Sequence, residues 1–189
     1  VWFCVWGGTA DLAQALWKIT QTRPQAEAER LLDKVRIYTI GLQDGSGQWL
    51  LDTFPRLFMI VSRQNHMGMF WNAAGSDPSV ADLKWVNQYI RRGHGLLGMA
   101  YPESGFYPDT PGVWEGDSPS FLYLVSAALG ISDAEKPDQP GWGGRFVRPD
   151  AGKNHWFDAP EGGKSVYQWR AQFQEDFARR ADRMLPPAK

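Results

Sequence analysis

The stretch that decides the fold is Val1-Trp2-Phe3-Cys4-Val5-Trp6-Gly7-Gly8-Thr9-Ala10-Asp11-Leu12. Its first six residues are continuously apolar, which is typical of a parallel strand covered on both faces. The pair Gly7-Gly8 ends the strand, and apolar residues then recur at helical spacing, at Leu12, Ala15, Leu16 and Ile19. The chain therefore opens with a strand–turn–helix unit, from which α/β proteins are built.

Two further units of this kind follow along the chain. Thr22 and Gln25 fit a capping box that starts a second helix. A strand is predicted over 36–40, a short helix over 48–54 and another strand over 57–61. Strands separated by helices at these intervals predict a parallel sheet with right-handed crossovers. The expected fold class is α/β, with a mainly parallel, Rossmann-like sheet flanked by helices.

The second half of the chain has a looser pattern. Asp77-Pro78 is expected to start a helix that Gly93 ends, and Ser118-Pro119 opens a helix that runs to Leu129. Residues 94–116 and 131–163 are predicted to be long loops, and loops of that length are usually functional or disordered. The last predicted helix carries one apolar stripe, made of Val166, Trp169, Phe173 and Phe177.

Composition excludes several classes of partner. With 189 residues, 43% of them hydrophobic, the chain has the size and composition of one globular domain. Its net charge of -1 gives no basic surface to attract nucleic acid or anionic lipid. The longest apolar run, residues 121–129, is far shorter than the roughly 20 residues of a membrane span. We therefore expect neither nucleic acid nor a membrane as partner.

Polar side chains follow each predicted strand. In open parallel sheets, ligands bind at the carboxyl ends of the strands. The segments there are 7–11, 41–44 and 62–65, and the turn 115–117 precedes a helix that is expected at the same edge. Oxygen-rich sites of this kind suit Ca²⁺ or the hydroxyls of a sugar. The candidates are Asp11, Gln43, Asp44, Glu115 and Asp117.

Each candidate also has a structural interpretation. Asp117 could cap its helix, an interaction that costs about 1 kcal/mol to remove. The segment Asp44-Gly45-Ser46-Gly47 could be a plain turn, and it is no EF-hand because Glu is absent from the twelfth position. The three histidines show no metal-binding spacing. The ten tryptophans suit either sugar rings or a core.

Four segments resemble a known family. Residues 6–16 resemble the strand–helix turn of nucleoside hydrolases. Residues 115–124, 142–146 and 169–178 are similar to further signatures of the bacterial cellulose-binding proteins with a nucleoside hydrolase-like domain. The resemblance covers nearly the whole chain in order. It implies that residues 1–185 are the later part of a nucleoside hydrolase-like domain that lacks its N-terminal aspartate-cluster segment, and that residues 186–189 begin a linker.

The resemblance also implies a site. Asp117 matches the aspartate that binds calcium in nucleoside hydrolases, whereas Gly116 stands where a histidine helps the base leave. A main-chain carbonyl near Ala10 would be a second calcium ligand. Side chains at Gln43 and Asp44 fall where ribose is bound, and Asn72 is a further sugar-contact candidate. The aspartates that activate water belong to the segment that this chain lacks.

Two functions follow from the resemblance. One is calcium-assisted hydrolysis of the glycosyl bond of a nucleoside-like or other small glycoside. The alternative is non-catalytic binding of cellulose or another plant polysaccharide, which the missing histidine and the tryptophan content favour. A planar surface row of Trp114, Trp142 and Trp156 would support the binding function. The expected partners are a small glycoside or polysaccharide and a companion chain with the missing segment, in the periplasm or outside the cell.

Overall fold

A computed structural model describes residues 1–105 and 109–185. The strands are β1 (Trp2–Val5), β2 (Arg36–Ile40), β3 (Phe58–Ser62), β4 (Phe146–Val147) and β5 (His155–Asp158). The α-helices are α1 (Ala10–Thr22), α2 (Gln25–Leu32), α3 (Gly45–Thr53), α4 (Leu83–Val86), α5 (Gly95–Ala100), α6 (Ser118–Ala128), α7 (Lys164–Tyr167) and α8 (Arg170–Ala181). Short 3₁₀ turns form η1 (Asn65–Met69), η2 (Pro78–Val80) and η4 (Asp182–Met184), and a π-turn forms η3 (Asn87–Arg91).

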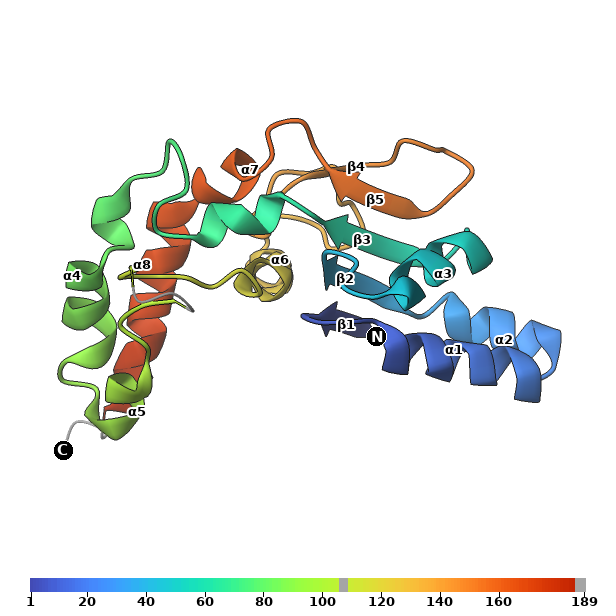
Figure 1. Ribbon diagram of the computed structural model, residues 1–189, viewed down its shortest axis with the longest axis horizontal. Helices are drawn as coiled ribbons and strands as arrows, with labels where there is room; N and C mark the ends of the chain where they lie inside the picture. The colour runs from blue at the N-terminus through green and yellow to red at the C-terminus, as the bar shows by residue number, and fades with distance from the viewer. Residues whose placement is uncertain (106–108, 186–189) are drawn as a thin grey trace.

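The strands form one five-stranded sheet with the order β1-β2-β3-β5-β4. Strands β1, β2, β3 and β5 run parallel, and only β4 pairs antiparallel, with β5. The sheet lies in the upper and right part of Figure 1, with β1 at its lower edge. The predicted α/β class with a mainly parallel sheet is thus confirmed.

Alternate residues of the strands face two different cores, as the pleat requires. One face packs against α1 and α3 and carries Ile37, Met59 and Val61, all fully buried. The other face carries Tyr38 and Ile60, which pack with residues of α6 and β4. Helix α6, seen end-on in Figure 1, therefore covers the face opposite to α1 and α3.

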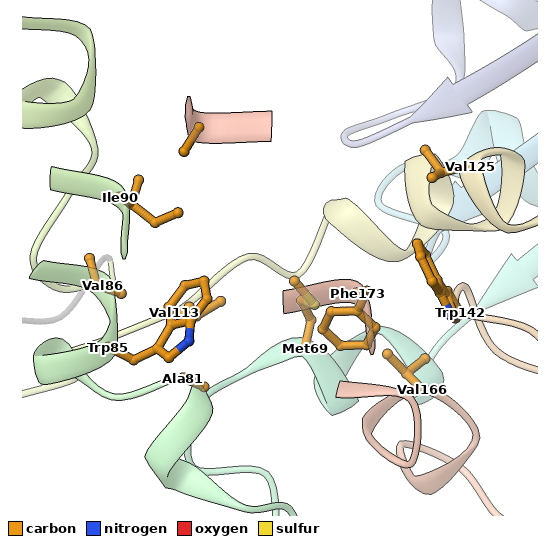
Figure 2. Close-up of a cluster of buried hydrophobic side chains, with 11 residues drawn as sticks. Met69, Ala81, Trp85, Val86, Ile90, Val113, Val125, Trp142, Val166 and Phe173 are labelled. Atoms are coloured by element: carbon orange, nitrogen blue, oxygen red, sulfur yellow. The ribbon is translucent and has the colours of Figure 1, made fainter. Parts of the chain in front are cut away.

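A second, helical region packs around its own core. Figure 2 shows Met69 and Phe173 between Trp85 on one side and Trp142 on the other. The buried stripe of α8 reaches this core through Phe173, while Trp85 comes from α4. Within 1–105 and 109–185, no helix combines the length and apolar character needed to cross a membrane.

The structure confirms most of the first-half prediction, with one local correction. The strand predicted over 36–40 is β2, and the one predicted over 57–61 is β3, one residue later. The capping box at Thr22 and Gln25 is wrong. Thr22 still belongs to α1, where its hydroxyl donates to the carbonyl of Lys18 at 2.7 Å, and Pro24 precedes α2 without a side-chain cap.

The second-half prediction needs larger corrections. The predicted loop 131–163 contains β4 and β5, and the loop 94–116 contains α5. The helix expected from Asp77 is broken into η2, α4 and η3, because two aspartates cap in succession. Asp77 accepts from the N–H of Ser79 at 2.9 Å, and Asp82 accepts from the N–H of Trp85 at 2.8 Å. Residues 186–189, the predicted linker, lie outside the described residues.

Candidate functional site

The amino end of α6 is held beside the carboxyl end of β1. The indole Nε1 of Trp6, directly after β1, donates to the hydroxyl of Ser120 at 2.7 Å. The same hydroxyl donates to the carbonyl of Asp117 at 2.8 Å, and the thiol of Cys4 lies 3.6 Å from the Ser120 carbonyl. The turn that contains Asp117 is therefore placed at the ligand-binding edge of the sheet.

Asp117 does not cap its helix. It stands at the N-cap position of α6 without a side-chain hydrogen bond to the helix, and its side chain is exposed. Partial desolvation raises the pKa of Asp117, and the nearby His66 opposes this shift. The carboxylate is therefore available to a ligand at the edge of the sheet.

His66 comes to the same place from the turn after β3. The ring contacts Phe70 edge-on, with centroids 6.4 Å apart. A Cβ added to Gly116 would lie 3.5 Å from Cδ2 of His66 and 3.2 Å from Cε1 of Phe70. Burial lowers the pKa of His66, whereas the charges of Asp158 and Asp117 act to raise it. The two rings thus occupy the space in front of Gly116.

Asp158 holds the turn that carries His66. One carboxylate oxygen of this last residue of β5 accepts from the backbone N–H groups of Arg63 and Gln64, both at 2.7 Å. The other oxygen accepts from the N–H of Asn65 at 3.4 Å. The N–H of His66 donates to the Ser62 hydroxyl at 3.2 Å. These bonds fix the backbone of the β3 turn against the end of β5.

A groove of about 710 Å³ continues from this turn toward α7. Its aromatic lining is Phe70, Trp114 and Tyr167, and its polar lining includes Gln64, Asn72 and Lys164. Phe70 and Trp114 are stacked, with ring centroids 4.2 Å apart and planes 2° apart. Another cavity, of about 240 Å³, lies between the ends of α2 and α3 and the start of β3, away from the carboxyl edge.

The row of three tryptophans that would have supported polysaccharide binding does not form. Trp142 is only 3% exposed and belongs to the helical core, where its Nε1 donates to Gln172 at 3.3 Å. Trp156 is half-buried, with Arg148 over its ring at 5.4 Å. Of the three, Trp114 alone lines the groove. Of these three tryptophans, only Trp114 remains a candidate for a sugar contact.

The predicted site residues do not gather in one place. Asp44 caps α3 by accepting from the Ser46 N–H at 2.9 Å, and hydrogen bonding to Ser46 lowers its pKa. It lies against Gly8, where a Cβ would be 1.8 Å from its Oδ2. Gln43 is exposed, and its side-chain amide donates to the carbonyl of Ile40 at 3.0 Å. Asp11 is exposed in the first turn of α1.

The remaining candidates lie on the other side of the edge. Asn72 lines the groove, and Asp117 lies beside His66. Glu115 is bound by the hydroxyls of Tyr101 and Ser118, which occupy both of its oxygens. The structure thus groups Asp44 with the turn after β1, and separately groups Asn72 and Asp117 around the turn after β3.

Sequence reasoning missed His66, Asp158 and Tyr167. The rule that selected residues 62–65 stops one residue before His66, so the signal was present in the strand end. Asp158 ends a strand that was predicted to be loop, and Tyr167 lies one element further on. Those two could be found only once the position of β5 was known.

A calcium ion would have few ligands within the described ranges. Calcium takes roughly six to eight oxygen ligands. No three His, Cys, Asp or Glu side chains of residues 1–105 and 109–185 gather into a metal-binding group. Asp117 has a carboxylate without a hydrogen bond to its helix, whereas the carbonyl of Ala10, the first residue of α1, points along the helix toward the next turn. The other oxygens would have to come from elsewhere.

Comparison with known proteins connects this architecture to a family. The model of the family described as the cellulose-binding Sde182, nucleoside hydrolase-like domain, matches residues 1–146. The chain belongs to this family. Its resemblance to nucleoside hydrolase-like cellulose-binding proteins is thereby confirmed, and the Sde182 family associates the domain with carbohydrate.

A similar solved structure agrees with this family membership. It is a nucleoside hydrolase-related hypothetical protein from Saccharophagus degradans that is associated with carbohydrate metabolism. It is 28% identical, with a TM-score of 0.73 over 100% of this chain. The Sde182-family chain described here spans 44% of the length of that protein. No curated protein matches the chain.

Proposed function

We propose that this domain binds a saccharide in the groove beside the turn after β3. The observation that carries the proposal is the set of unpaired polar groups in that groove. Within the described ranges, no hydrogen bond is formed by the side chains of Gln64, Asn72, Lys164 or Tyr167, all of which line it. Free amides, an ammonium and a phenol beside aromatic rings match the hydroxyls and apolar faces of a sugar.

The geometry of the groove supports an extended ligand. A pocket for a drug-sized molecule has a volume of about 300–1,000 Å³. The groove holds about 710 Å³ and opens to solvent along exposed residues such as Asn72 and Lys164. Its aromatic wall is rigid, because Trp114 is stacked on Phe70 and packed against Gly105. A preformed wall lowers the entropic cost of binding.

The test is binding of cellohexaose, measured by calorimetry, to the wild-type chain and to Asn72→Ala. One neutral hydrogen bond contributes about 1 kcal/mol, so the variant is expected to bind about fivefold more weakly. Gln88→Ala is the matched control, since this exposed amide lies in η3 and does not line the groove. Equal affinities of wild type and Asn72→Ala would argue against the groove as the binding site.

A second candidate function is calcium-assisted hydrolysis of a glycosyl bond. The observation in its favour is the free carboxylate of Asp117 beside His66 at the carboxyl edge. When bound, the ion would activate water and hold sugar hydroxyls. Asp117 would supply one of its ligands, and its negative charge would favour the oxocarbenium-like transition state.

Hydrolysis is tested with p-nitrophenyl riboside and this chain combined with the companion segment that the resemblance implies, with and without Ca²⁺. Turnover is expected to require Ca²⁺ and to be lost in Asp117→Asn, which removes the charge but keeps the shape. Asp150→Asn, in the exposed segment before β5, should leave turnover unchanged. If Ca²⁺ binds to the folded protein and no turnover follows, the domain is a binding module alone.

A further inference from the structure

A further concave surface lies at the amino ends of three parallel strands. It is a pocket of about 420 Å³ at the point where β2, β3 and β5 begin. Its lining includes Arg36 and Phe58, the first residues of β2 and β3, and Asn154, which directly precedes β5. The groove, by contrast, is lined by residues that follow the carboxyl ends of β3 and β5. The pocket is therefore separate from the proposed saccharide site.

Cationic side chains outnumber acidic ones in this pocket. Four of them line it, from three distant parts of the sequence: Arg36, Arg56, Arg148 and Lys153. Within the described ranges, Asp33 is the one acidic residue of the lining. Glu135, which binds Arg36, and Asp150, which accepts from the N–H of the lining residue Gly152, lie beside it. Even with these three carboxylates counted, positive charge is in excess. The net charge of -1 conceals this cluster, because only the fold brings its members together.

The guanidinium of Arg36 is held in place by the residues around it. Its Nε donates to both carboxylate oxygens of Glu135, at 3.0 and 2.9 Å, and its Nη1 donates to the carbonyls of Asp33 and Val35. The guanidinium also lies over the ring of Phe58, 5.2 Å from its centroid. Arg36 is thus a fixed positive charge at the base of β2, which an incoming anion would meet without ordering a flexible side chain.

Arg148 and Lys153 have no acidic partner. Neither side chain forms a hydrogen bond or a salt bridge with the described part of the chain. The guanidinium of Arg148 lies over the ring of Trp156 at 5.4 Å, and the indole of Trp156 donates to the side chain of Asn154 at 3.1 Å. An arginine stacked on an aromatic ring keeps its N–H groups available for a carboxylate or a phosphate. The pocket therefore combines oriented cations with free donors.

We propose that this pocket binds a small anion that carries two or more phosphate, sulfate or carboxylate groups. The planar fork of an arginine matches the oxygens of these groups in pairs, and the ammonium of Lys153 adds a point charge. A volume of about 420 Å³ lies within the range of small-ligand pockets. A multiply charged ligand fits better than a single-charge ion, because the unpaired cations come from separate side chains. The proposal is independent of saccharide binding in the groove.

The ligand chemistry has two sources, a phosphorylated small molecule and an acidic saccharide. Calorimetric titrations of the wild-type chain with inorganic pyrophosphate and with trigalacturonate distinguish them. We expect at least one probe to bind, with an affinity that falls several-fold between about 50 and about 200 mM NaCl, because salt screens exposed charges. Binding of pyrophosphate alone would identify a phosphorylated ligand, and binding of trigalacturonate alone an acidic saccharide. If neither probe binds, the proposal is wrong.

Variants locate the binding in the pocket. Arg148→Gln is expected to bind the active probe at least about tenfold more weakly, and Lys153→Gln about threefold more weakly. Both side chains are exposed, so an unchanged melting temperature should confirm that the variants fold. Lys18→Gln is the control, since it makes the same change of charge on the exposed face of α1, outside the pocket. Equal weakening in all three variants would assign binding to overall charge, and unchanged affinity in Arg148→Gln and Lys153→Gln would place it elsewhere; either result overturns the proposal.

Discussion

At the scale of single residues, the turn after β3 depends on one carboxylate, that of Asp158. Asp158 accepts from three successive backbone N–H groups of the turn after β3, two of them at 2.7 Å. Hydrogen bonds to a charged group contribute about 1.5–3 kcal/mol, and of the three donors only the N–H of Asn65 is partly buried when it loses its acceptor. We therefore expect Asp158→Ala to lower the free energy of unfolding by about 2 kcal/mol, measured by urea denaturation.

Two variants separate this effect from the loss of any surface aspartate. Asp158→Asn keeps one acceptor oxygen without the charge and should lose about half as much. Asp150 bonds only the N–H of Gly152 in an exposed turn, so Asp150→Ala should cost less than about 0.5 kcal/mol. Equal losses for Asp150→Ala and Asp158→Ala would show that the turn after β3 does not depend on its carboxylate.

Two aspartates show what the sequence alone could not decide. Asp44 and Asp117 both follow the pattern of a helix cap, and the sequence left capping and ligand binding open for each. In the structure Asp44 caps α3 through Ser46, whereas Asp117 caps nothing. The amino end of α6 is also held by the distant Trp6, and no local sequence pattern encodes that contact.

At the scale of elements, strands with a local sequence pattern could be predicted, whereas a strand defined by long-range pairing could not. Strands β2 and β3 were located within one residue because each is a run of apolar residues between turn signals. Strand β5 is only His155–Asp158, with polar residues at both ends, and its parallel partner β3 lies far back in the sequence. A short strand of mixed polarity has no sequence pattern of its own, and it forms only because it pairs with a neighbouring strand.

Because β5 was not predicted, most of the candidate site could not be predicted either. Without β5, the sequence could not place Asp158 beside the turn after β3, nor bring α7 and its Tyr167 to the groove. The carboxyl-edge rule selected Gln64, which lines the groove, and Asp117, whose charge acts on His66. The rule depends only on parallel strands, so errors in the second half of the chain do not affect which residues it selects.

At the scale of the whole molecule, the sheet leaves one apolar edge uncovered. Among the described strands β1 pairs only with β2, and around it Val1, Phe3 and Trp6 are 77%, 39% and 54% exposed. An edge strand presents unpaired N–H and C=O groups to other chains, and proteins usually protect such edges with charge. The companion segment that the resemblance implies would satisfy these groups by adding a further strand.

The chain by itself is therefore expected to associate through β1, and a charge on this edge should prevent it. Phe3 is a suitable position because its side chain is partly exposed and it belongs to none of the three hydrophobic cores. Size-exclusion chromatography with light scattering should find concentration-dependent self-association of the wild type and a monomer for Phe3→Lys. Leu97→Lys places the same charge on α5, 69% exposed and away from the sheet, and should still associate. Association lost equally in both variants would assign it to general hydrophobic contact, whereas loss in Phe3→Lys alone would make β1 the edge through which the chain associates.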